Sequence, residues 1–160
     1  MVREELPVHP LTRQPLTGKL KPEEICPSCA KCCKYVCIEI DKPVSVKAVS
    51  NILWYLYHRS VAVFMDHDGD WAVAFEGVCE HLTPDGLCGV YEHRPLICRD
   101  YDVRHCEGTA ATPIEKHRFT RAHEFTDWLR AHKPKVFARC KAKGIIPLAL
   151  LEREGPAGHR

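Results

Sequence analysis

The sequence predicts an α+β fold: a small single domain with a short β-hairpin, two or three helices and irregular cysteine-bearing loops organised around a metal site. Three observations support this fold class. Two apolar runs flank an acidic loop, apolar residues recur at helical spacing before and after that hairpin, and most of the ten cysteines gather in two groups outside these elements. A chain of 160 residues is long enough for one domain with a single core.

The elements between the two cysteine groups have local signals. Residues 34–40 alternate apolar and polar side chains, which indicates a short strand. Residues 45–58 predict an amphipathic helix with Ser45 as its N-cap. The runs 61–65 and 71–75 predict a hairpin, and we interpret the Asp-rich loop between them as a solvated turn because it lacks the length and terminal Glu of an EF-hand loop.

The last third of the chain is expected to be helical. Thr112-Pro-Ile-Glu115 combines a cap residue, a proline and a capping-box glutamate, which predicts that a helix starts there. Pro134 would interrupt it before a shorter helix that ends at Gly144. The expected organisation is an extended N-terminal arm over 1–25, a cysteine-cluster metal-binding domain over 26–107, a helical C-terminal extension packing on it over 108–151, and a mobile tail over 152–160.

Composition excludes several classes of protein. Lys plus Arg number 23 and Asp plus Glu number 21, so the net charge of +2 implies neither strong DNA affinity nor an acidic-tail function. The N-terminus lacks the apolar core of a signal peptide, and no apolar run approaches the ~20 residues of a membrane span. We therefore expect a cytoplasmic protein with no membrane partner, whose clustered cysteines are metal ligands or catalytic thiols rather than disulfides.

The first cysteine group is a strong metal signal. The pattern Cys26-x2-Cys29-x2-Cys32 places three thiolates where one metal ion or one cluster can bind them. Ferredoxin-type [4Fe–4S] sites open with the same spacing, whereas zinc ribbons pair two C-x2-C knuckles, so an iron–sulfur cluster is slightly preferred over zinc. Cys33 directly follows Cys32, and neighbouring side chains of an extended backbone diverge, which suggests two metal positions or one multinuclear site.

The ordered motifs resemble a known family. They are CPSCAKCC, Cys79, Asp85-Gly-Leu-Cys88, Arg94-Pro95 and Cys98-Arg99-Asp-Tyr101, and over residues 26–107 they are similar to the YkgJ-type cysteine cluster family, described as a putative zinc- or iron-chelating domain (CxxCxxCC). The resemblance implies that the metal ligands are Cys26, Cys29, Cys32, Cys33, Cys79, Cys88 and Cys98, with Cys106 as an eighth position. It also implies that Arg94 and Arg99 position a loop and balance thiolate charge. Related domains in flagellin lysine methylases are thought to hold an iron–sulfur cluster.

Other residues near the motifs have plainer interpretations. Cys37 and Cys140 match no family position, and we interpret both as small buried hydrophobic residues. His81, His93 and His105 are not included among the ligands because a lone histidine beside a metal motif more often supports a ligand or lies at the surface. Ala30 stands where the family often has glycine.

Two alternative functions stay open beside metal binding. A metal-dependent enzyme acting on a protein or small-molecule substrate would have to use the metal site itself, because the chain has no nucleotide loop, serine elbow or zinc-protease helix. A zinc-stabilised binding module is suggested by residues 116–143, which contain nine Lys or Arg against two Asp or Glu. Such a surface would suit an acidic protein or nucleic-acid partner, although a solvated helix pair is the plainer interpretation.

Overall fold

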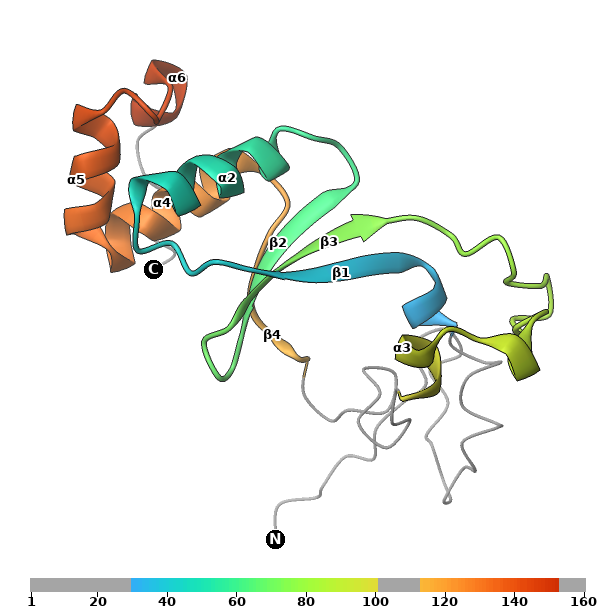
Figure 1. The fold of residues 1–160 in the computed structure, drawn as a ribbon. Coiled ribbons are helices and arrows are strands. Elements are labelled where there is room, and N and C mark those ends of the chain that lie inside the picture. Colours follow the sequence, from blue (N-terminus) through green and yellow to red (C-terminus); the bar gives the residue numbers. More distant parts are fainter. Residues whose placement is uncertain (1–29, 101–112, 153–160) are drawn as a thin grey trace, which may run out of the picture. The chain divides into compact units, whose positions relative to one another are not determined.

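The computed structural model describes residues 30–100 and 113–152, and its chain forms two compact units (Figure 1). The first unit consists of residues 1–36 and 77–114, and the second of residues 37–76 and 115–160. The two units therefore alternate along the sequence. The expected N-terminal arm and, apart from Glu152, the expected tail lie outside the described residues.

A four-stranded sheet has the strand order β1-β3-β2-β4. The strands are β1 (Tyr35–Ile40), β2 (Val61–Asp66), β3 (Trp71–Glu76) and β4 (Glu115–Phe119). The central strand β2 pairs antiparallel with both β3 and β4, and its Val63 lies opposite Val73 on one side and Phe119 on the other. The predicted first strand and the predicted hairpin are confirmed.

The hairpin loop between β2 and β3 is a tight turn. The backbone N–H of Asp70 donates to the Asp66 side chain at 2.8 Å, and the Asp66 N–H donates to the Asp70 carbonyl at 3.0 Å. Gly69 has a φ of 83°, a left-handed conformation that glycine adopts without strain. The Asp70 carboxylate also pairs with Lys42 at 3.0 Å, so this acidic loop is a solvated turn, as the sequence predicted.

Three helices of two or more turns belong to the second unit: α2 (Val46–Leu56), α4 (Ala122–His132) and α5 (Pro134–Ala142). The Ser45 hydroxyl accepts a hydrogen bond from the Ala48 N–H at 3.1 Å, which confirms the predicted N-cap of α2. α5 begins at Pro134, and Gly144 follows its end with a φ of 65°. A single-turn helix that the sequence did not predict, α6 (Leu148–Leu151), comes next.

The prediction that a helix starts at 112–115 is wrong. Residues 115–119 form β4 instead, with Phe119 buried against β2, and α4 begins only at Ala122. The true start of α4 uses Glu124, whose carboxylate accepts hydrogen bonds from the N–H groups of Thr120 and Arg121 at 2.7 and 3.1 Å. A capping pattern is local, whereas a strand depends on its partner, so pairing with distant β2 overrode the local signal.

The hydrophobic core of the second unit lies between the sheet and these helices. α2 contacts β2, α4 contacts β4, and the three longer helices contact one another. Phe125 and Val63 are 0% exposed, and Trp71 is 3% exposed and stacks on Phe119 with ring centres 5.8 Å apart. Residues drawn from both sequence segments of the unit thus share one core. Among the described residues, no helix is long and apolar enough to cross a membrane.

Candidate metal centre

Five of the eight predicted ligands lie in the part of the first unit that the structure describes. Cys32 and Cys33 lie in the 3-10 helix η1 (Lys31–Cys33), and the other three lie between β3 and β4 in the sequence. Cys26, Cys29 and Cys106 lie outside the described residues. The five described ligand candidates are not in disulfides, with Cys33 and Cys88 half-buried and the others exposed, so their sulfur atoms are chemically available to a metal. These are Cys32, Cys33, Cys79, Cys88 and Cys98.

Backbone hydrogen bonds join the two cysteine groups. The Cys79 N–H donates to the Cys33 carbonyl at 2.8 Å, and the Gly77 N–H donates to the Lys34 carbonyl at 3.0 Å. Two adjacent bonds of this kind fix the register of the two segments. The backbone therefore holds Cys33 of the first group next to Cys79, as a shared metal centre requires.

A small hairpin follows Cys79 and carries Cys88. Leu82 bridges to Cys88, the Thr83 N–H donates to the Leu87 carbonyl at 2.9 Å, and the Gly86 N–H donates back to the Thr83 carbonyl at 2.9 Å. Gly86 has a φ of 78°, which glycine adopts readily at this position of a turn. The predicted turn at 83–86 is confirmed. The Leu82 N–H donates to the Cys79 carbonyl at 3.0 Å, which ties this hairpin to the cysteine before it.

Arg99 organises the loop that carries Cys98. Its Nε donates to the Arg94 carbonyl at 2.7 Å and its Nη2 to the Glu92 carbonyl at 3.2 Å. The Arg94 guanidinium lies 3.8 Å from the centre of the Tyr91 ring. These contacts fold the segment from the 3-10 helix η2 (Tyr91–His93) to the short helix α3 (Leu96–Arg99). The loop-positioning role expected for both arginines is confirmed, and their charge-balancing role stays a prediction.

The thiols of this unit influence one another electrostatically. Burial raises the pKa of the Cys33 thiol, its hydrogen bond with Cys32 lowers that pKa, and the negative charges of Cys79, Cys88 and Cys98 raise it. All four other described candidates thus act on Cys33. In the described ranges, however, no three Cys, His, Asp or Glu side chains are already placed to hold one metal ion.

The contact between Cys32 and Cys33 differs from the sequence expectation. The prediction of diverging side chains assumed an extended backbone, but Lys31–Cys33 form a 3-10 turn, and the two thiols are hydrogen-bonded to each other. The turn is closed by the Cys33 N–H, which donates to the Ala30 carbonyl at 3.1 Å. Ala30 itself is buried and has a φ of 46°, the left-handed region in which glycine is unstrained. This conformation explains why glycine suits this position.

The described part of the first unit has almost no hydrophobic core. Ala30 is its single buried apolar residue there, whereas large apolar side chains are exposed, with Leu96 at 72% and Ile97 at 78%. Hydrophobic burial within this described part therefore contributes little to its stability. Small domains with few core residues usually depend on a disulfide or a metal, and the described ligand candidates here form no disulfide.

Of the two cysteines outside the ligand set, one was predicted correctly and one was not. Cys140 is fully buried in the core of the second unit, as expected, and burial raises its pKa. Cys37 lies on β1 and is exposed, so its interpretation as a buried residue is wrong; its place in a strand left its face undecided. His81 lies 3.5 Å from the Glu80 carboxylate. His105 lies outside the described residues.

Two arginines of the basic segment 116–143 form contacts with other parts of the second unit. Arg130 donates to the Leu150 carbonyl at 3.3 Å and lies over the Phe137 ring, and Arg139 donates to the Val44 carbonyl at 3.0 Å. Their long side chains pack on the second unit instead of extending freely into solvent. This arrangement favours a solvated helix pair over a binding face for nucleic acid.

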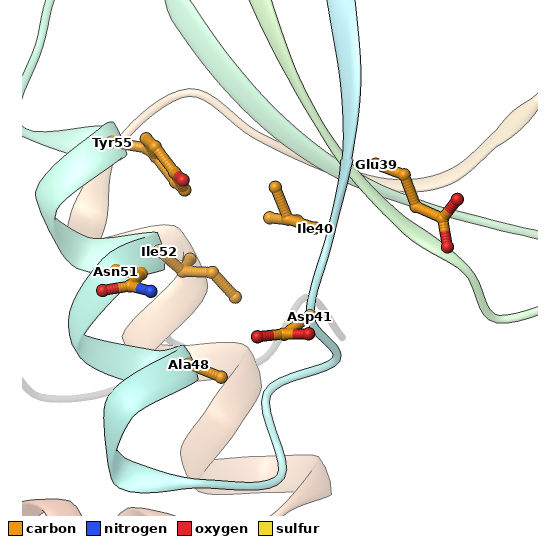
Figure 2. Close-up of a pocket in the computed structure, with 7 residues that line it drawn as sticks. All are labelled: Glu39, Ile40, Asp41, Ala48, Asn51, Ile52 and Tyr55. Carbon is orange, nitrogen blue, oxygen red and sulfur yellow. The ribbon is translucent and has the colours of Figure 1, made fainter.

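A shallow groove of about 250 Å³ lies between β1 and α2 in the second unit (Figure 2). Ile40, Ala48 and Ile52 supply its apolar lining, and Figure 2 shows Asp41 directed toward α2 while Glu39 points to the other side of the strand. Asn51 and Tyr55 complete it. Because no cysteine lines this groove, it does not form part of the thiol-bearing site.

The fold and the grouped thiols define a small α+β protein of the cysteine-cluster, metal-binding class. The chain belongs to the family described as CxxCxxCC, putative zinc- or iron-chelating domain, whose model matches residues 25–129. This match extends beyond the last cysteine motif through β4 and most of α4, so the family pattern covers residues of both units. No curated protein and no solved structure matches the chain significantly.

Proposed function

We propose that this protein binds a multinuclear metal–thiolate centre, an iron–sulfur cluster in preference to zinc, and that the first unit folds around it. The proposed ligands are Cys26, Cys29, Cys32, Cys33, Cys79, Cys88, Cys98 and Cys106. The observation that carries this proposal is the combination of joined cysteine groups with so little buried apolar surface in the described part of the first unit. Metal binding is the source of folding energy that such a segment would use.

The donor chemistry fits a soft or borderline metal. Thiolates select zinc, copper(I) and iron–sulfur clusters rather than magnesium or calcium. A single tetrahedral ion accepts four ligands, so eight thiolates imply more than one metal ion. The hydrogen-bonded pair Cys32 and Cys33 supports a shared centre, because adjacent thiols can bind neighbouring metals of one cluster.

Electrostatics supports the same proposal. Negative charge at Cys79, Cys88 and Cys98 raises the pKa of the Cys33 thiol, and a bound cation would offset that repulsion. Arg94 and Arg99 add positive charge close in sequence to Cys98, although their guanidinium groups are also bound to backbone carbonyls. A metal centre is the arrangement that accounts for both the thiols and the loop that presents them.

Analysis of metal and acid-labile sulfide tests the proposal directly. The full chain is purified anaerobically from cells supplied with both iron and zinc, and its absorption spectrum is recorded. We expect iron with stoichiometric sulfide and a broad visible band. Colourless protein with bound zinc would refute the cluster assignment, and protein with neither metal would refute the centre.

Two exposed cysteines provide a matched pair of variants. Cys79→Ser is expected to lose most of the bound metal, because a serine hydroxyl is a poor replacement for a soft thiolate ligand. Cys37→Ser is expected to retain it, since Cys37 is equally exposed but matches no ligand position. Equal metal retention in the two variants would contradict the ligand assignment.

A further inference from the structure

A pair of histidines lies outside the cysteine-bearing unit, where the C-terminal end of α4 lies beside β4. The imidazole of His117 on β4 and that of His132 at the end of α4 have ring centres 6.0 Å apart, and Trp128 contacts both rings. These residues belong to the second unit, where β4 and α4 pack together (Figure 1). Neither histidine is needed for the proposed cysteine centre.

The hydrogen bonding of His132 leaves one ring nitrogen available. Its Nδ1 lies 2.9 Å from the Trp128 carbonyl oxygen, and because a carbonyl can only accept, Nδ1 carries the proton. In a neutral ring the other nitrogen, Nε2, then holds a free lone pair. Histidines that bind metals commonly have this arrangement, in which a backbone carbonyl fixes the tautomer and the ring orientation.

His117 is half-buried, and its imidazole has the properties of a second ligand. In residues 30–100 and 113–152, its ring has aromatic contacts and no hydrogen-bond partner. Desolvation lowers its pKa, and the positive charges of His132 and Lys116 lower it further, so the ring is neutral at physiological pH. A neutral imidazole is the form that coordinates a metal ion.

We infer that His117 and His132 together bind one divalent transition-metal ion at a site separate from the cysteine centre. With metal–nitrogen bonds of about 2.0–2.1 Å, two imidazole ring centres sharing one ion lie roughly 5–6 Å apart, which the observed separation matches. Among the described residues no third ligating side chain joins this pair, so the inference concerns the two imidazoles alone. Imidazole ligands favour zinc, nickel and copper over magnesium or calcium.

The helix α2 provides an internal comparison. Trp54 in α2 and His58, two residues beyond its end, repeat the spacing of Trp128 and His132, and His58 Nδ1 also donates to the carbonyl four residues earlier, at 2.8 Å. The rings of Trp54 and His58 lie 5.1 Å apart. Among the described residues, however, no second imidazole contacts His58. A lone imidazole should bind the same ion much more weakly.

The test is a zinc titration followed by NMR on the ¹⁵N-labelled full chain that already carries its resident metal. We expect the ring-nitrogen resonances of His117 and His132 to shift together and to saturate at the same zinc concentration, while those of His58 stay unchanged. In His132→Gln, we expect the zinc affinity reported by His117 to fall at least about tenfold. His132 is exposed, so this variant should keep the fold, and an unchanged melting temperature checks that it does.

Two results would overturn the inference. One is a His58 shift at the same zinc concentration as the pair, which would indicate nonspecific binding to surface imidazoles. The other is a His117 shift that persists unchanged in His132→Gln. His58→Gln serves as the matched control, because it removes an imidazole that contacts a tryptophan four residues earlier, as His132 does, and it is expected to leave zinc binding by the pair unaffected. The cysteine centre does not influence these outcomes, since the readout is specific to each histidine.

Discussion

Replacing Arg99 should loosen the loop that carries Cys98. The guanidinium bonds two carbonyls at once, those of Arg94 and Glu92. A lysine ammonium has one nitrogen and cannot reproduce this fork, so Arg99→Lys should keep at most one of the two bonds. Arg99→Ala should lose both.

The size of the effect follows from these two bonds. A buried hydrogen bond to a charged group contributes about 1.5–3 kcal/mol, but Arg99 is exposed, so about 1 kcal/mol for each bond is appropriate. The lysine variant should therefore lose about 1 kcal/mol and the alanine variant about 2 kcal/mol of loop stability. These losses correspond to roughly fivefold and thirtyfold reductions in the ratio of ordered to disordered loop.

Two assays measure this loss. Amide hydrogen exchange at Cys98, whose N–H donates to the Pro95 carbonyl at 2.9 Å, should accelerate by these factors, whether or not metal is bound. If Cys98 is a ligand, competition with a chelator should show a parallel fall in metal affinity. Arg59, an exposed arginine of the second unit, provides the control in Arg59→Ala. Unchanged exchange at Cys98 in Arg99→Ala would refute the reasoning.

Three further predictions concern single side chains. Ala30→Gly should raise the free energy of unfolding by up to about 1 kcal/mol in a denaturant titration, because glycine relieves left-handed strain at a smaller entropic cost; a decrease would contradict this. Cys140→Ser should lower it by about 1–3 kcal/mol with unchanged metal content, since it buries a hydroxyl in the core, and a loss of metal would oppose this. Because the pKa of folded His117 lies below its ordinary 6.5, the folded state binds fewer protons, and stability should fall as the pH drops from about 7 to 5. His117→Gln should flatten that slope and His58→Gln should not, as thermal unfolding at several pH values would show.

Elements with local signals were predicted well from the sequence. The cap at Ser45, the helix that follows it and the hairpin with its acidic turn all depend on residues close in sequence. The grouping of the cysteines and the family were also accessible, because the CPSCAKCC string and the later motifs are specific in their order.

Features that depend on distant partners were missed. β4 forms because residues 115–119 pair with the edge of β2, whereas the pattern at 112–115 predicted the start of a helix. The exposure of Cys37 depends on which face of β1 is buried within the second unit, which alternation alone does not determine. The pairing of His117 with His132 requires both that strand and the end of α4, so no sequence spacing indicates it.

The alternation of the two units along the chain has a consequence for synthesis. The hydrogen bond between Cys33 and Cys79 cannot form until residue 79 has been made, and at roughly 5–20 residues per second this takes about two to ten seconds after Cys33 is added. The core of the second unit must wait longer still, for Phe125 and Leu129. The early thiols are therefore made before their partners, and a centre that uses all of the proposed ligands can assemble only after residue 106 has been made.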